Sequence, residues 1–161
     1  MKFMWKKIKP YVISVAIALG VGGLSAFFTR NNMTVYENIN QPPLAPPMIL
    51  FPIVWSILFI LMGIGSAIVY QKQGENRAES TSALWIYGMQ LVVNFFWSII
   101  FFNMQAYLFA FIWLVLLEIL IILMIFRFSK VSKTAAYLQV PYLLWVTFAG
   151  YLNLMVYLLN G

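Results

Sequence analysis

The residues of this chain best suited to recognise a ligand are amides, hydroxyls and aromatic rings that recur at helical spacing in three apolar stretches. The first set is Gln90, Asn94, Trp97, Ser98 and Phe101; the second is Trp55, Phe59, Met62 and Ser66; the third is Tyr142, Trp145, Ala149 and Asn153. Intervals of three and four positions place each set on one face of a helix. A single aromatic face is typical of packing, and a single amide is typical of a hydrogen bond between helices. Three such faces together predict a pocket for a flat, apolar ligand with a few polar edges.

The residue types exclude most conventional catalysis. The chain has no histidine and no cysteine, so it offers no imidazole base, no thiol nucleophile and no zinc site of the usual kind. A haem iron would lack its two commonest protein ligands. We therefore predict no metal and no cofactor, and we assign no residue a certain catalytic role.

The composition predicts that these faces lie inside a membrane. Apolar residue types make up 63% of the 161 positions and charged types 9%, whereas a soluble domain is about 25% charged. Continuous apolar runs cover 11–28, 50–70, 83–102, 107–126 and 134–158. Their lengths approach or exceed the roughly 20 residues with which a helix crosses a bilayer, and they lack the alternation of barrel strands. We predict an all-α bundle of five transmembrane helices forming a single domain, 1–161.

The basic residues predict the orientation of this bundle. Nine of the ten lysines and arginines fall in segments on one side of the predicted membrane, and Arg30 alone falls on the other. The N-terminus is therefore expected in the cytoplasm and the C-terminus outside. Because the charges are spread over three segments, they favour contact with anionic lipid headgroups over nucleic-acid binding.

The loop 29–49 between the first two runs is the longest, and Pro42, Pro43, Pro46 and Pro47 stiffen it. Its length favours a lid over the predicted pocket. In the alternative interpretation, Pro46 and Pro47 serve only to begin the next helix.

Glu118 is the one carboxylate within a predicted span. A charge at that depth is costly, so we expect this side chain to form a hydrogen bond with a polar group on a neighbouring helix. A proton-coupled step is the alternative role.

Three motifs carry a resemblance to a known family. They are PLAPP at 43–47 followed by FPIVW at 51–55, QLVVNFFWS at 90–98, and PYLLWVTFA at 141–149. In this order they resemble signatures of the TspO/MBR family, the tryptophan-rich sensory proteins related to the mitochondrial translocator protein.

The resemblance implies a five-helix homodimer with a pocket closed by the first loop. It also implies tetrapyrrole ligands such as protoporphyrin, and synthetic compounds of the isoquinoline and benzodiazepine type. Carried over by position, the pocket would comprise Tyr36, Pro46, Trp55, Phe59, Asn94, Trp97, Ser98, Trp145 and Ala149, to which helical spacing adds Gln90. Sterols are discounted, because no basic residue follows Tyr157 as the family's sterol motif requires.

The sequence thus predicts a receptor or transport-type protein for tetrapyrroles in a bacterial cell membrane. The alternative is an enzyme-like, light- and oxygen-dependent degradation of protoporphyrin, in which Trp55 and Trp145 would be the redox-active residues. Ion or proton transport rests on Glu118 alone.

Overall fold

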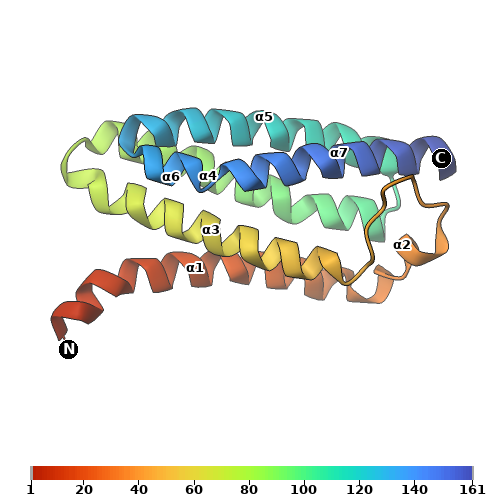
Figure 1. Ribbon diagram of the computed structural model, residues 1–161, viewed down its shortest axis with the longest axis horizontal. Helices are drawn as coiled ribbons and strands as arrows, with labels where there is room; N and C mark the ends of the chain where they lie inside the picture. The colour runs from red at the N-terminus through yellow and green to blue at the C-terminus, as the bar shows by residue number, and fades with distance from the viewer. Residues whose placement is uncertain (1, 161) are drawn as a thin grey trace.

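The computed structural model describes residues 2–160, which form a bundle of long helices running side by side (Figure 1). The long helices are α1 (Lys2–Thr29), α3 (Leu50–Gln71), α4 (Arg77–Ser98), α5 (Tyr107–Val131) and α7 (Val140–Asn160). The short ones are η1 (Arg30–Asn32), α2 (Val35–Asn38), η2 (Lys72–Gly74), η3 (Ile99–Asn103) and α6 (Lys133–Tyr137). Within the described residues, five helical segments are long and apolar enough to cross a membrane. The predicted five-span, all-helical architecture is confirmed, and the two ends of the chain lie at opposite ends of the bundle (Figure 1).

The fifth span differs from the continuous helix expected over 134–158. The chain turns at Leu138 and Gln139, between α6 and α7. Pro141 explains the break, because its ring has no N–H to donate and would clash with the carbonyl of Tyr137 in an unbroken helix. The buried Gln139 side chain donates from Nε2 to the carbonyl oxygen of Leu61 at 3.3 Å and so links this turn to α3.

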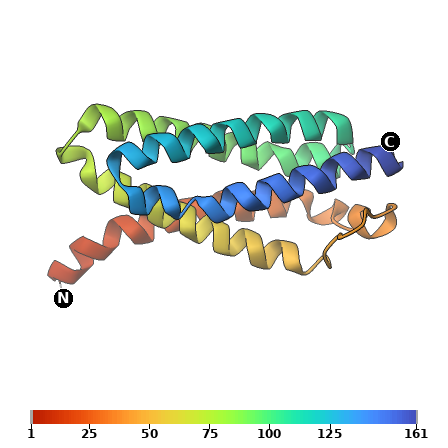
Figure 2. The ribbon, with the colours of Figure 1, turned by 45° about the horizontal axis from the view of Figure 1, so that its top comes forward.

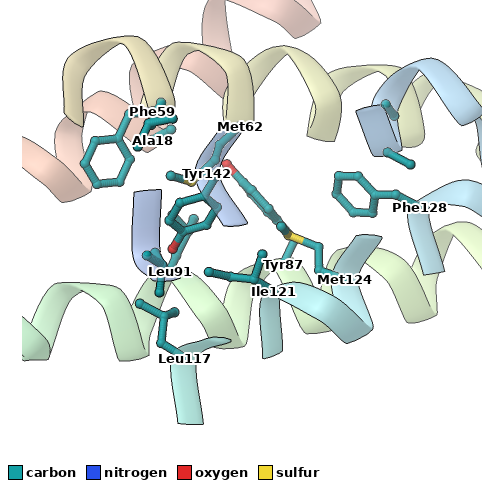
Figure 3. Close-up of a cluster of buried hydrophobic side chains, with 14 of the residues drawn as sticks. Ala18, Phe59, Met62, Tyr87, Leu91, Leu117, Ile121, Met124, Phe128 and Tyr142 are labelled. Atoms are coloured by element: carbon teal, nitrogen blue, oxygen red, sulfur yellow. The ribbon is translucent and has the colours of Figure 1, made fainter. Parts of the chain in front are cut away.

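The core in the half of the bundle away from the lid is filled by large side chains from α3, α4, α5 and α7 (Figure 3). Met62, Ile121, Met124 and Phe128 are fully buried there. The opposite faces of the same helices carry exposed apolar residues, for example Ile112, whose side chain is 60% exposed. Apolar side chains on both faces are what a bundle surrounded by lipid requires.

Helix α1 packs closely against α3 because small residues occur at the contact. A Cβ atom added to Gly63 would lie 2.5 Å from the Cα atom of Val15, and one added to Gly22 would lie 2.5 Å from the ring of Phe59. Ala18, between these two points, is fully buried. These positions allow the two backbones to approach as in other small-residue contacts in membranes.

The segment between α1 and α3 covers one end of the bundle and reaches the end of α7 (Figures 1 and 2). We call residues 30–49 the lid. The Tyr36 hydroxyl donates to the carbonyl oxygen of Pro46 at 2.8 Å, and the Tyr151 hydroxyl of α7 donates to that of Pro43 at 2.8 Å. The backbone N–H of Asn40 donates to Asn160 Oδ1 at 2.8 Å. The lid is therefore tied both to itself and to α7.

Candidate functional site

A cavity of about 300 Å³ lies beneath the lid, enclosed by α1, α3, α4, η3 and α7. No charged side chain is among the described residues that line it, and most of its wall is apolar. An uncharged, mainly apolar cavity suits a flat, apolar ligand rather than an ion.

Seven of the ten residues predicted to bind ligand line this cavity. They are Tyr36 from the lid, Trp55 and Phe59 from α3, Asn94, Trp97 and Ser98 from α4, and Ala149 from α7. The helical spacing that suggested three converging faces is thus matched by three converging walls. Pro46, Gln90 and Trp145 are placed elsewhere.

Pro46 lies behind Tyr36, and its carbonyl oxygen accepts the hydrogen bond that holds the Tyr36 ring over the cavity. Burial raises the pKa of the Tyr36 phenol. A tyrosine hydroxyl is protonated at neutral pH even without this shift, so it is able to donate this bond.

Gln90 is fully buried and belongs to a chain of hydrogen bonds that ends at the cavity. Asn94 Nδ2 donates to the Tyr142 hydroxyl at 2.7 Å, and that hydroxyl donates to Gln90 Oε1 at 2.6 Å. Gln90 Nε2 in turn lies 3.8 Å from Met62 Sδ. The Tyr142 hydroxyl has one proton and donates it to Gln90, so it must accept its other bond from Asn94. The Asn94 amide is therefore oriented with Nδ2 toward Tyr142, and its Oδ1 accepts no hydrogen bond from the described residues. Gln90 therefore supports a wall residue from behind.

Trp145 contacts the cavity wall from outside. Its ring centroid lies 5.9 Å from that of Phe51, which lines the cavity, and the two rings meet edge to face. On its other side Trp145 borders a shallow apolar groove between α3 and α7. Its buried indole N–H has no acceptor among the described residues.

Two tryptophans from different helices hold the cavity's aromatic walls. The Trp55 ring lies 5.6 Å from Phe59 and 6.2 Å from Tyr142. The indole N–H of Trp97 donates to Asn153 Oδ1 at 3.0 Å, and Asn153 Nδ2 donates to the carbonyl oxygen of Tyr107 at 2.8 Å. Both rings are thus held by α3, α4 and α7, and they offer flat surfaces to a ligand.

The wall contributed by α1 is what the sequence pattern did not indicate. Gly22, Gly23 and Ala26 line the cavity, although the small-residue spacing of this helix is equally typical of close packing. Phe101, which the predicted face included, and Phe102 line the cavity from the π-helical turn η3, into which α4 continues. Such turns are frequent at functional sites, but no residue type in the sequence predicts one.

Glu118 lies apart from this cavity, on the side of α5 that meets α7. Its Oε1 accepts a hydrogen bond from the Thr147 hydroxyl, so the expected hydrogen bond to a neighbouring helix is present. Neither residue lines the cavity.

Comparison with known proteins identifies close similarities over nearly the whole chain. The profile of the TspO/MBR family matches residues 13–158. The chain is 39% identical to Tryptophan-rich protein TspO of Chlorobaculum tepidum over 158 residues, covering 98% of this chain and 99% of that protein. It is 36% identical to Tryptophan-rich protein TspO of Archaeoglobus fulgidus, covering 96% and 99%. It is 32% identical to Translocator protein of Bos taurus, covering 89% and 88%.

Proposed function

The chain belongs to the TspO/MBR family of membrane proteins, and we propose that it is a receptor or transport-type protein that binds protoporphyrin or a similar tetrapyrrole beneath the lid. The main observation behind this proposal is an uncharged cavity lined by Trp55 and Trp97 from two helices. It lies beneath a lid that is held by the hydrogen bond of Tyr36 to Pro46. A macrocycle can stack on indole rings, and its apolar edges match the remaining walls. With no histidine or cysteine in the chain, a free-base porphyrin suits the cavity better than haem.

Names of relatives agree with this class of function. The relative in Bos taurus is named a translocator protein, and one in Cereibacter sphaeroides is named a tryptophan-rich sensory protein. We extend the proposal to a homodimer in a bacterial cell membrane. Synthetic isoquinoline- and benzodiazepine-type compounds, which are flat and apolar, are proposed as further ligands.

Filling the cavity tests this proposal. Ala149 lies on the α7 wall and is 6% exposed, so Ala149→Phe places a ring where the ligand would lie. Titration of the protein in lipid nanodiscs with protoporphyrin, followed by tryptophan quenching, should show affinity reduced about tenfold or more. Ala16→Phe, on the exposed face of α1, is the control and should bind as the unaltered protein does. Equal affinity of Ala149→Phe at unchanged melting temperature would place the ligand elsewhere.

A second candidate is the light- and oxygen-dependent degradation of protoporphyrin. The observation that favours it is the position of Trp55, which lines the cavity and contacts Tyr142, so an oxidisable ring would adjoin the bound macrocycle. Illumination of the complex with and without oxygen tests it. A protein-bound product formed only with light and oxygen, and lost in Trp55→Phe, would support degradation; bleaching at the rate of free protoporphyrin would exclude it.

A further inference from the structure

The exposed residues of the cavity wall all belong to two neighbouring helices, α1 and α3. Among its described wall residues, the exposed ones are Leu19, Gly23 and Ala26 of α1 and Pro52 and Ser56 of α3. We call these five residues the lateral mouth. The wall residues of α4, η3, α7 and the lid are buried or only partly exposed. The opening therefore lies along the seam between α1 and α3.

The lateral mouth lies within the parts of α1 and α3 that are long and apolar enough to span a membrane. Its α1 residues fall inside the apolar segment Met4–Asn32, and its α3 residues fall inside Leu50–Gly74. Leu24, Phe27, Ile53 and Ile57, which flank it along the two helices, are more than half exposed, as lipid-facing side chains are. The one hydroxyl in the mouth, that of Ser56, donates to the carbonyl oxygen of Pro52 at 2.7 Å within its own helix.

The mouth is bounded by contacts that leave it separate from both ends of the bundle. On one side Phe59 packs against Gly22, and further along Val15 packs against Gly63. Toward the lid, the Thr29 side chain lines the cavity and is buried. Between these points the cavity wall of α1 is made of small residues, Gly23, Ser25 and Ala26, and the opening lies beside them.

The lid, in contrast, closes the aqueous end of the cavity with several hydrogen bonds. Passage there would break the bond of Tyr36 to Pro46 and the bond of Tyr151 to Pro43. It would also separate Asn40 from Asn160, which are joined by two bonds of 2.8 and 2.9 Å. Among the described residues, no hydrogen bond joins α1 to α3 across the lateral mouth, and the Ser56 hydroxyl bonds within its own helix.

We propose that the ligand enters and leaves sideways through the lateral mouth, as a flat apolar molecule already dissolved in the bilayer, while the lid stays closed. This inference rests on the proposed function, because it supplies the route to that same cavity. It makes the membrane, and not the aqueous phase, the source of the ligand.

Gly23→Phe tests the route. A Cβ atom at Gly23 meets no atom within 4 Å, so the helix accepts a ring there and the ring obstructs the mouth. Gly20→Phe is the matched control, because Gly20 is equally unobstructed on the same helix but does not line the cavity. Stopped-flow quenching by protoporphyrin in nanodiscs should show association slowed about tenfold or more in Gly23→Phe. The association rate is the decisive measurement, because Gly23 also lines the cavity and an added ring there changes the Kd as well.

Two further measurements keep the result decisive. Ser56→Phe obstructs the mouth from α3 and should slow association in the same way. Tyr151→Phe removes the lid's bond to α7 and should leave both rates unchanged; faster binding and release in this variant would show passage through the lid and overturn the proposal. Unchanged rates in both mouth variants would overturn the route while leaving the proposed function intact. Absence of quenching in the unaltered protein would instead refute the proposed function and the route together.

Discussion

The two halves of the bundle are equally apolar, but one has a filled interior and the other contains a cavity that could hold a ligand. In the half away from the lid, Met62, Met124 and Phe128 fill the interior completely, and α1 touches α3 at Gly63. In the lid half, Gly23 and Ala26 of α1 face Trp55 of α3 across an open cavity. The comparison shows that side-chain size, and not hydrophobicity, decides which half is core and which is site.

The largest expected effect concerns the filled half. Gly63→Ala would place a methyl group 2.5 Å from the Val15 backbone, which cannot move without displacing α1. We expect a loss of about 2–3 kcal/mol of stability, as for other overpacked cores. Thermal unfolding in detergent would measure it. The control is Gly88→Ala on α4, where an added Cβ meets nothing within 4 Å; equal melting temperatures would show that the filled half tolerates expansion.

The next largest effect concerns ligand affinity in the half with the cavity, and it differs between Trp55 and Trp145. Trp55→Phe removes part of a cavity wall and should cost about 1–2 kcal/mol of protoporphyrin affinity, by analogy with modest core truncations. Trp145→Phe should cost less, because Trp145 contacts the wall from outside through Phe51. Quenching titrations of both variants give the comparison. A larger loss in Trp145→Phe would mean that the bound state moves Trp145 into the cavity.

Asn94 lies where the two halves meet, so its replacement should affect both. Asn94→Leu removes the donor to the Tyr142 hydroxyl, and we expect stability to fall by about 1 kcal/mol, the scale of hydrogen bonds between membrane helices. Protoporphyrin affinity should change as well, because Asn94 lines the cavity. Melting curves with and without protoporphyrin separate these contributions. An effect on stability alone would assign Asn94 to the core.

The smallest effect is expected outside both halves. Glu118 is paired with Thr147 away from the cavity, so Glu118→Gln keeps the shape and a hydrogen bond while removing the ability to ionise. Binding of protoporphyrin should keep the same dependence on pH from mildly acid to mildly alkaline conditions, as judged by quenching titrations. Loss of an existing pH dependence in this variant would restore a proton-coupled role.

Much of the candidate site could be read from periodicity. The spacing of Phe59, Asn94 and Ala149 placed each on the correct helical face, because 3.6 residues per turn relates sequence to direction within one helix. The same reasoning selected Gln90 and Trp145, which point toward the same region but lie behind the wall. Depth within a bundle depends on neighbouring helices, so periodicity cannot separate a wall residue from its support.

By itself the sequence determined that the protein lies in a lipid bilayer, that it has five spans and which family it belongs to. These depend on composition, run length and local motifs. Only the tertiary structure decided the π-helical turn Ile99–Asn103 and the opening beside Gly23. The opening depends on how two helices meet: a glycine is equally suited to a close contact, as at Gly63, or to a gap. Which one forms is settled by the side chain that faces it across the seam.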